Sequence, residues 1–129
     1  MTEHVVADSS PLIIYQRIEQ LDLLRAVFGS IVIPTAVLHE VFRNQESPEW
    51  IQERPLKQPI ASQIASARLG AGEREAIALA LEINASLLIV DDLPARRLAQ
   101  GLGIKVIGSA DTLLRAKELK NHCFHSSTT

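Results

Sequence analysis

The chain has 129 residues, of which 47% are hydrophobic and 22% are charged; this length suits one domain with a substantial core, and this composition excludes intrinsic disorder. The formal net charge of -2 excludes a global positive field that would attract nucleic acid, so such a partner requires local basic residues, a metal or a second subunit. With one cysteine, no signal peptide and no apolar stretch of the about 20 residues that cross a bilayer, we expect a cytoplasmic protein without a membrane partner.

The first part of the chain predicts two short buried strands, because two apolar runs lack the alternation of half-exposed strands. These strands cover residues 4–7 and 31–33. The expected helices cover residues 11–18, 21–28 and 36–43. Gly29 is a C-cap for the second of these helices. Three prolines among polar residues make 44–60 an irregular connection, with one helical turn around Trp50.

The second part of the chain continues the alternation of helices and strands. The expected helices cover residues 62–69, 73–83, 94–101 and 110–120, and the expected strands cover residues 86–90 and 104–107. Ser109 caps the last helix, and residues 121–129 are expected to be a disordered tail. The pattern predicts a three-layer α/β/α sandwich with a mostly parallel sheet, in a single domain over residues 1–120.

Acidic residues follow the predicted strands or lie on helices that run past the strand ends. They are Asp8, Glu40, Glu73, Asp91 and Asp92. In parallel sheets, binding sites form beyond the carboxyl ends of the strands, so these residues are candidates for one cluster. Two unit charges about 5 Å apart repel by roughly 3 kcal/mol at an effective dielectric of about 20, so the cluster requires a counter-charge. Oxygen ligands of this kind suit Mg²⁺ or Mn²⁺.

Glu73 has the clearest helical context. Ala76, Ile77 and Ala80 lie around the same helix face, so its carboxylate is centred on an apolar stripe. The alternative is an acid in a helix's first turn that the helix dipole favours. Glu75 falls on the opposite side, where solvated surface explains it.

The other acids each have a plain alternative. Asp8 also suits a turn or N-cap, and Glu40 lies at the border of its helix's buried face, where a single acid would be ordinary surface charge. One of Asp91 and Asp92 is expected to cap the helix that Pro94 begins, which leaves the other free to bind metal. The sequence does not decide which of the two does so.

Several short motifs occur in a fixed order between residues 4 and 118. They are Asp8-Ser9-Ser10-Pro11-Leu12-Ile13, then Ile33-Pro34 with Val37 and Glu40-Val41, Gly72-Glu73 with Ala76-Ile77-Ala78-Leu79-Ala80, Asp91-Asp92 with Ala95-Arg96, and Gly108 with Ala116-Lys117. With this set the chain resembles a PIN-domain protein, of the PIN-like group whose first motif is D/N-[ST]-[ST]-P-L-I.

The resemblance implies a metal-dependent ribonuclease, and many bacterial and archaeal PIN relatives are toxins of toxin-antitoxin pairs. It implies that Asp8, Glu40, Glu73 and Asp91 or Asp92 form a Mg²⁺ or Mn²⁺ site, which Ser10 supports. The metal would activate a water for in-line attack on an RNA phosphodiester. Arg96, about one turn beyond the acid pair, is expected to contact phosphate. We therefore expect an endoribonuclease toxin that cleaves RNA, forms a homodimer and is restrained by an antitoxin protein.

The chain departs from this family pattern at two points. Glu73 stands where the wider family has an Asp, and these relatives commonly continue past Lys117 with further strand and helix structure. The second departure predicts a missing fifth strand and an exposed sheet edge, which a partner or second subunit would cover. A catalytically inactive PIN-like module that binds RNA or protein is therefore the alternative, and a receiver-like phosphoacceptor domain ranks last.

Overall fold

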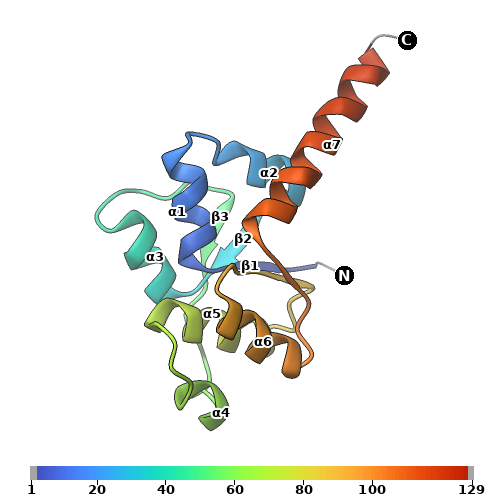
Figure 1. Ribbon diagram of the computed structural model, residues 1–129. Helices are drawn as coiled ribbons and strands as arrows, with labels where there is room; N and C mark the ends of the chain where they lie inside the picture. Colours follow the sequence, from blue (N-terminus) through green and yellow to red (C-terminus); the bar gives the residue numbers. More distant parts are fainter. Residues whose placement is uncertain (1–2, 128–129) are drawn as a thin grey trace.

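Five parallel strands form one sheet in the computed structural model, which describes residues 3–127 and the side chains of residues 3–119 (Figure 1). The strands are β1 (Val5–Ala7), β2 (Ile31–Ile33), β3 (Ile51–Glu53), β4 (Leu87–Ile89) and β5 (Val106–Ile107), in the spatial order β3-β2-β1-β4-β5. β1 therefore occupies the centre of the sheet. The α/β class and the parallel sheet predicted from the sequence are confirmed.

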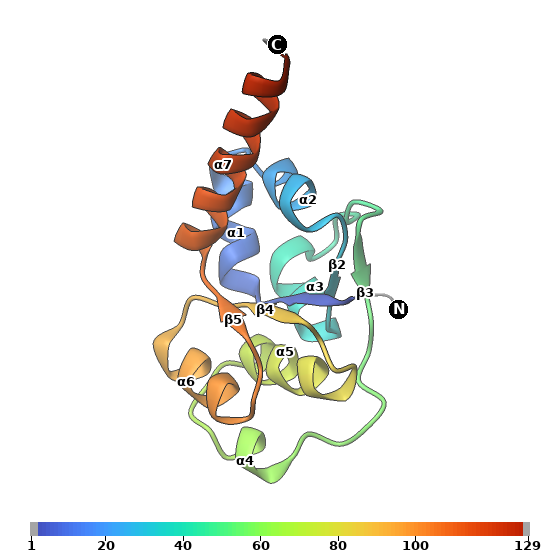
Figure 2. The ribbon, with the colours of Figure 1, turned by 90° about the vertical axis from the view of Figure 1, so that its right-hand side faces the viewer.

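Helices cover both faces of the sheet. They are α1 (Ser9–Arg17), α2 (Asp22–Phe28), α3 (Thr35–Phe42), α4 (Ser62–Ala65), α5 (Ala71–Glu82), α6 (Leu93–Gly101) and α7 (Ser109–Ser127). In two views at right angles, α1, α2 and α7 lie on one side of the sheet and α4, α5 and α6 on the other (Figures 1 and 2). α3 contacts both α1 and α5. None of the described helices combines the length and the apolar character that a bilayer crossing requires.

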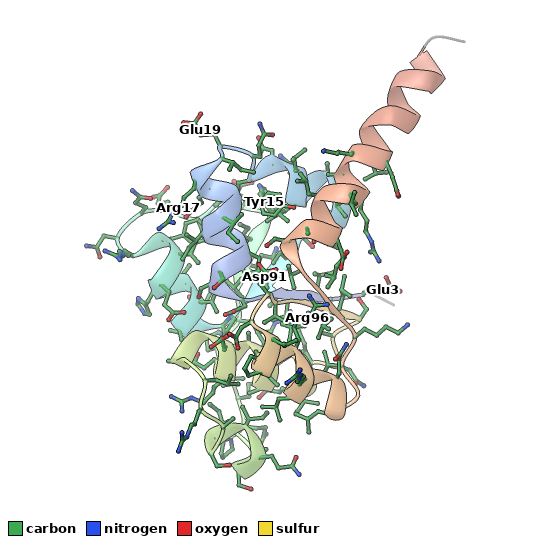
Figure 3. The ribbon with its side chains drawn as sticks, viewed as in Figure 1. Glu3, Tyr15, Arg17, Glu19, Asp91 and Arg96 are labelled. Atoms are coloured by element: carbon green, nitrogen blue, oxygen red, sulfur yellow. The ribbon has the colours of Figure 1, made fainter. Side chains whose placement is uncertain are left out.

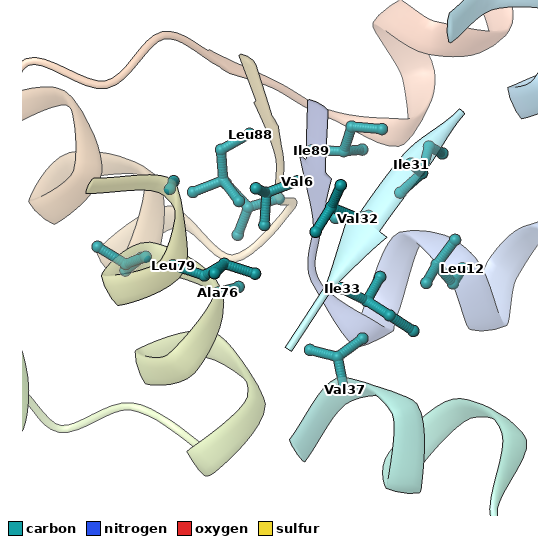
Figure 4. Close-up of a cluster of buried hydrophobic side chains, with 14 of the residues drawn as sticks. Val6, Leu12, Ile31, Val32, Ile33, Val37, Ala76, Leu79, Leu88 and Ile89 are labelled. Carbon is teal, nitrogen blue, oxygen red and sulfur yellow. The ribbon is translucent and has the colours of Figure 1, made fainter. Parts of the chain in front are cut away.

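The central strands are apolar along their length because helices cover both of their faces. All three residues of β2 are buried, and Val6, Leu88 and Ile89 are fully inaccessible to solvent. Figure 4 shows Leu79 of α5 and Leu12 of α1 among the side chains that pack around these strands. Burial on both faces explains why these strands appear in the sequence as continuous apolar runs.

The prediction for residues 44–60 was wrong, because this segment contains β3. Ile51 pairs with Ile31 and Glu53 with Ile33 in a parallel register. Only Ile51 of the three residues in β3 is buried, so the strand has almost no apolar pattern. With β3 the sheet has five strands where the sequence indicated four, although no strand follows Lys117 in the described residues. β3 forms one edge of the sheet and β5 forms the other.

Two helices differ in length from the sequence prediction. α4 ends at Ala65, four residues before the expected end, whereas α7 runs to Ser127. The sequence indicated a disordered tail over residues 121–129, but no glycine or proline stands between Ser109 and Ser127 to stop the helix. The last two residues of that segment lie outside the described part. The C-terminal part of α7 projects beyond the body of the domain (Figure 2).

Glu75 connects two helices that carry candidate site residues. The sequence placed Glu75 on solvated surface, but it is half-buried, and its Oε1 accepts a hydrogen bond from the backbone N–H of Ala36 at 3.1 Å. Ala36 lies in the first turn of α3, where backbone N–H groups have no partner within the helix. Glu75 of α5 therefore caps α3 from outside, and it ties the helix that carries Glu40 to the helix that carries Glu73.

We expect Glu75→Ala to lower the free energy of unfolding by about 1 kcal/mol, because it leaves the Ala36 N–H without its carboxylate partner. Glu46→Ala removes an exposed glutamate and is the matched control. Urea unfolding followed by circular dichroism measures both variants. Equal stability of the two variants would show that the contact contributes nothing.

Candidate metal centre

Four carboxylates meet at the carboxyl edge of the sheet. Asp8 directly follows β1, and Asp92 follows β4. Glu40 lies on α3 and Glu73 lies in the first turn of α5. The charges of Glu73, Glu40 and Asp92 all act on Asp8. The structure therefore places within electrostatic range of Asp8 three carboxylates that are spread over more than fifty residues of sequence.

Asp8 is the buried centre of this carboxylate cluster. It is only 1% exposed, and neither of its side-chain oxygens has a hydrogen-bond partner of standard geometry. Burial raises the pKa of Asp8 from 3.8 to about 7; the Ser9 backbone N–H opposes this rise in part, and Glu73, Glu40 and Asp92 add to it. Asp8 occupies the N-cap position of α1 without a capping bond from its side chain. Capping of α1, the alternative role considered for Asp8, therefore does not explain why this carboxylate is buried.

Glu73 serves its helix and faces the cluster at the same time. Its Oε1 accepts a hydrogen bond from the Gly70 N–H at 3.0 Å, which satisfies a backbone donor at the start of α5. Burial raises the pKa of Glu73 against the lowering effect of the Gly70 N–H, and Asp92 raises it further by its charge and by a hydrogen bond. Glu73 therefore stabilises the start of α5, as a first-turn acid does, and its carboxylate also lies beside Asp92.

Ser9 and Gly72 hold Glu40, and the sequence analysis identified neither as part of the site. The Ser9 hydroxyl donates a short hydrogen bond to Glu40 Oε1. A Cβ on Gly72 would lie 1.9 Å from Glu40 Oε1, so only glycine leaves room for this carboxylate. Ser10, the support residue expected from the resemblance, is exposed. A helix starting at Ser9 places Ser9 on the same face as buried Leu12, which is the signal that could have distinguished the two serines.

The adjacent acids Asp91 and Asp92 have different partners. Asp92 Oδ2 accepts a hydrogen bond from the Ala95 N–H at 3.2 Å and caps α6. Asp91 Oδ1 accepts one from the Ser109 N–H at 2.7 Å, and its Oδ2 accepts one from the Ser109 hydroxyl. The sequence analysis expected the acid that does not cap the helix to remain free. Instead the capping residue, Asp92, faces Asp8 and Glu73, while Ser109 engages Asp91.

Arg96 lies near Asp91, next to the carboxylate cluster. It is half-buried on α6, and Figure 3 shows it beside Asp91. A Cβ on Gly108 would lie 2.8 Å from Arg96 Nη1 and 2.9 Å from Asp91 Oδ1, so both side chains occupy space that only glycine leaves open. Tyr15 donates a hydrogen bond to the Ser109 carbonyl at 3.0 Å. Burial and the Asp91 charge raise the pKa of Tyr15, which keeps this donor protonated.

The donor set fits a hard divalent cation. Every member is a carboxylate, and the buried Asp8 oxygens lack partners, as expected for ligands of a positive ion. Among the side chains of residues 3–119, no group of three or more His, Cys, Asp or Glu is already arranged to hold a metal ion. The carboxylates therefore share one electrostatic environment without a finished coordination sphere.

A family model described as a PIN domain matches residues 4–123 of the sequence. The chain belongs to the PIN domain family. PIN domains are generally nucleases that use divalent metals, and the resemblance stated from the sequence motifs is confirmed. The match covers every acid of the cluster.

The PIN fold is also present in a solved structure that this chain resembles. It is a PilT N-terminus domain protein from the hyperthermophilic archaeon Sulfolobus solfataricus P2. The TM-score is 0.62 at 21% sequence identity, over 88% of this chain and 92% of that chain. At this identity the likeness shows the fold. No curated protein matches the sequence.

The raised pKa of Asp8 predicts how the stability of this PIN domain depends on pH when metal is chelated. Between about pH 4 and about pH 7 the folded state keeps a proton on Asp8 that the unfolded chain has lost. The free energy of unfolding therefore falls as pH rises through this interval, by at most about 4 kcal/mol for a shift from 3.8 to about 7.

Asp8→Asn should abolish this fall in the free energy of unfolding as pH rises. We expect the variant to be more stable than the wild type near pH 8 and to lose that advantage near about pH 4, as measured by urea unfolding in EDTA. Asp22→Asn, which changes an exposed acid on α2, is the control. A constant difference between Asp8→Asn and wild type at all pH values would contradict the assignment.

Proposed function

We propose that this PIN domain is a Mg²⁺- or Mn²⁺-dependent endoribonuclease. The observation that carries the proposal is Asp8: a buried carboxylate whose oxygens have no hydrogen-bond partner of standard geometry, with the charges of three further carboxylates acting on it. Placing an anion there without a counter-charge costs several kcal/mol, and a fold gains nothing from such a residue unless a ligand uses it. The family membership supports a nuclease, because PIN domains are generally nucleases.

The residues of the site have separate tasks in this proposal. Asp8, Glu73, Asp92 and Glu40 would hold the metal, Ser9 orients Glu40, and Arg96 would contact an RNA phosphate. When bound, the ion supplies an activated water for in-line attack on the phosphodiester and stabilises the leaving oxygen. The burial of Asp8 excludes bulk water from one side of the cluster, which strengthens electrostatic interactions with a cation.

The proposal extends to the biological role. We propose a cytoplasmic toxin of a toxin-antitoxin pair, a homodimer that an antitoxin protein restrains. The support for the toxin role and for these partners is the motif set that the chain shares with PIN-like toxins. Co-purification of a small protein encoded beside this chain, with loss of RNA cleavage in the complex, would test it.

We expect RNA cleavage by the purified protein to require Mg²⁺ or Mn²⁺ and to stop on addition of EDTA. Asp8→Asn should reduce the cleavage rate by more than about 100-fold, since even residues behind metal ligands typically contribute about 10- to 100-fold. A fluorescent single-stranded RNA measures the rate, and Asp22→Asn is the control variant. Cleavage that resists EDTA and survives Asp8→Asn would defeat the proposal.

The second candidate is an inactive PIN-like module that binds RNA or protein. Two observations favour it: Glu73 stands where the wider family has Asp, and the described side chains hold no preassembled metal group. It predicts binding of RNA without turnover. Metal-dependent hydrolysis that co-purifies with the wild-type protein and disappears in Asp8→Asn would exclude it.

Gly72→Ala tests the contribution of Glu40 to metal binding. The new Cβ would displace the Glu40 carboxylate and separate it from Ser9, so we expect Mn²⁺ affinity to fall by about 10- to 100-fold. Stability should change by less than about 1 kcal/mol, because the obstructed atoms belong to a side chain that can move and alanine favours a helix.

Gly101→Ala is the matched control, because a Cβ at that helical position meets no atom within 4 Å. Isothermal titration with Mn²⁺ and thermal unfolding measure both variants. Unchanged Mn²⁺ affinity in Gly72→Ala would exclude Glu40 from the metal site.

A further inference from the structure

We propose that Glu75 is a positioning residue of the metal site: by fixing the register between α3 and α5, it sets where the Glu40 carboxylate lies relative to Glu73. This inference rests on the proposed function, in which Glu40 and Glu73 hold the metal. Glu75 lies on the same helix as Glu73, but its carboxylate binds the start of α3. It therefore acts on metal binding through Glu40 and not as a ligand.

The helices α3 and α5 approach each other closely at two points. At the first point, Glu75 Oε1 accepts the hydrogen bond from the Ala36 N–H at 3.1 Å. At the second point, Glu40 fills the space beside Gly72, where an added Cβ would overlap Glu40 Oε1. Glu40 lies four residues after Ala36, and Gly72 lies three residues before Glu75, so the two points are about one helical turn apart on each helix. Both contacts therefore belong to one register, in which the two helices run in opposite chain directions.

The hydrogen bond to Glu75 is the directional contact of this pair. Val37 of α3 and Ala76 of α5 are buried in the apolar core, and such contacts have no preferred direction (Figure 4). A hydrogen bond to a backbone N–H requires a distance of about 2.7 to 3.2 Å. A slip of one residue moves a helix by about 1.5 Å along its axis, which is enough to break this bond. The positive end of the α3 dipole also favours the Glu75 carboxylate at this place.

Glu40 depends on the register because its carboxylate lies in a narrow place. The Ser9 hydroxyl donates to its Oε1, and Gly72 borders the same oxygen. Glu73 directly follows Gly72 on α5, so a movement of α3 along α5 changes the separation between Glu40 and Glu73. Binding groups need to be held within about 0.5 Å of their productive geometry. Loss of the Glu75 contact would therefore weaken metal binding.

Glu82 provides a matched control on the same helix. Its carboxylate accepts hydrogen bonds from the backbone N–H groups of Lys57 at 3.0 Å and Gln58 at 2.9 Å. Glu82→Ala thus removes the same kind of contact as Glu75→Ala but leaves the bond to α3 intact. We expect both variants to be less stable than the wild type in urea with EDTA, so Mn²⁺ affinity distinguishes a positioning role from a purely structural one.

Isothermal titration with Mn²⁺ tests the inference. We expect Glu75→Ala to lower Mn²⁺ affinity by about 10-fold, as typical of residues that orient metal ligands. Glu82→Ala should leave the affinity unchanged, and Glu75→Gln, which keeps an acceptor for the Ala36 N–H, should retain most of it. If Glu75→Ala does not fold, Glu75→Asp, which keeps the charge but shortens the reach of the acceptor, should lower the affinity instead.

A double-variant comparison tests whether Glu75 acts through Glu40. In the Glu40→Gln background, adding Glu75→Ala should change Mn²⁺ affinity by less than about 2-fold, because the ligand that Glu75 positions is already lost. Unchanged affinity in Glu75→Ala, an equal loss in Glu82→Ala, or additive effects of Glu75→Ala and Glu40→Gln would overturn the inference. A wild-type protein that neither binds Mn²⁺ nor cleaves RNA would instead overturn the proposed function.

Discussion

The site depends on one costly arrangement, the burial of the Asp8 carboxylate at the end of the central strand. The Asp8 N–H donates to the Ile89 carbonyl at 2.9 Å, so the sheet ladder continues one residue beyond β1 and fixes where the side chain begins. Because the neighbouring charges that act on Asp8 are carboxylates, only a proton or a cation relieves it. Burial and the neighbouring acids raise the pKa of Asp8, so a cation would be favoured beside it and a further anion disfavoured.

Two glycines make the dense packing of charged groups around Asp8 geometrically feasible. Gly72 and Gly108 lie at or just before the start of a helix, where the backbone approaches the carboxyl edge of the sheet. The space of the missing Cβ at Gly72 holds Glu40, and the corresponding space at Gly108 holds Arg96 and Asp91. Neither glycine is needed for a left-handed conformation, because both have ordinary φ values. Their role is the close approach of functional side chains to the backbone.

Sequence predicted the parts of this molecule that repeat a strong local pattern. The runs at β1, β2 and β4 are apolar because they are buried on both faces, and Glu73 was identified because it interrupts an apolar helix face. β3 was missed because one buried residue makes no pattern. Ser10 was named as the supporting serine from the family resemblance, whereas the structure buries Ser9, which lies three residues before the buried Leu12 on the same face of α1.

The choice between Asp91 and Asp92 was beyond sequence because it depends on Ser109, eighteen residues away. Successive side chains of an extended backbone point in opposite directions, so an acid pair at a strand end divides its charge between two places. In the proposed metal site Asp92 would be the fourth carboxylate, and one divalent ion would offset only half of the negative charge. The remainder would repel an RNA phosphate. Arg96, which is half-buried on α6 next to Gly108, would offset part of that repulsion in the proposed site.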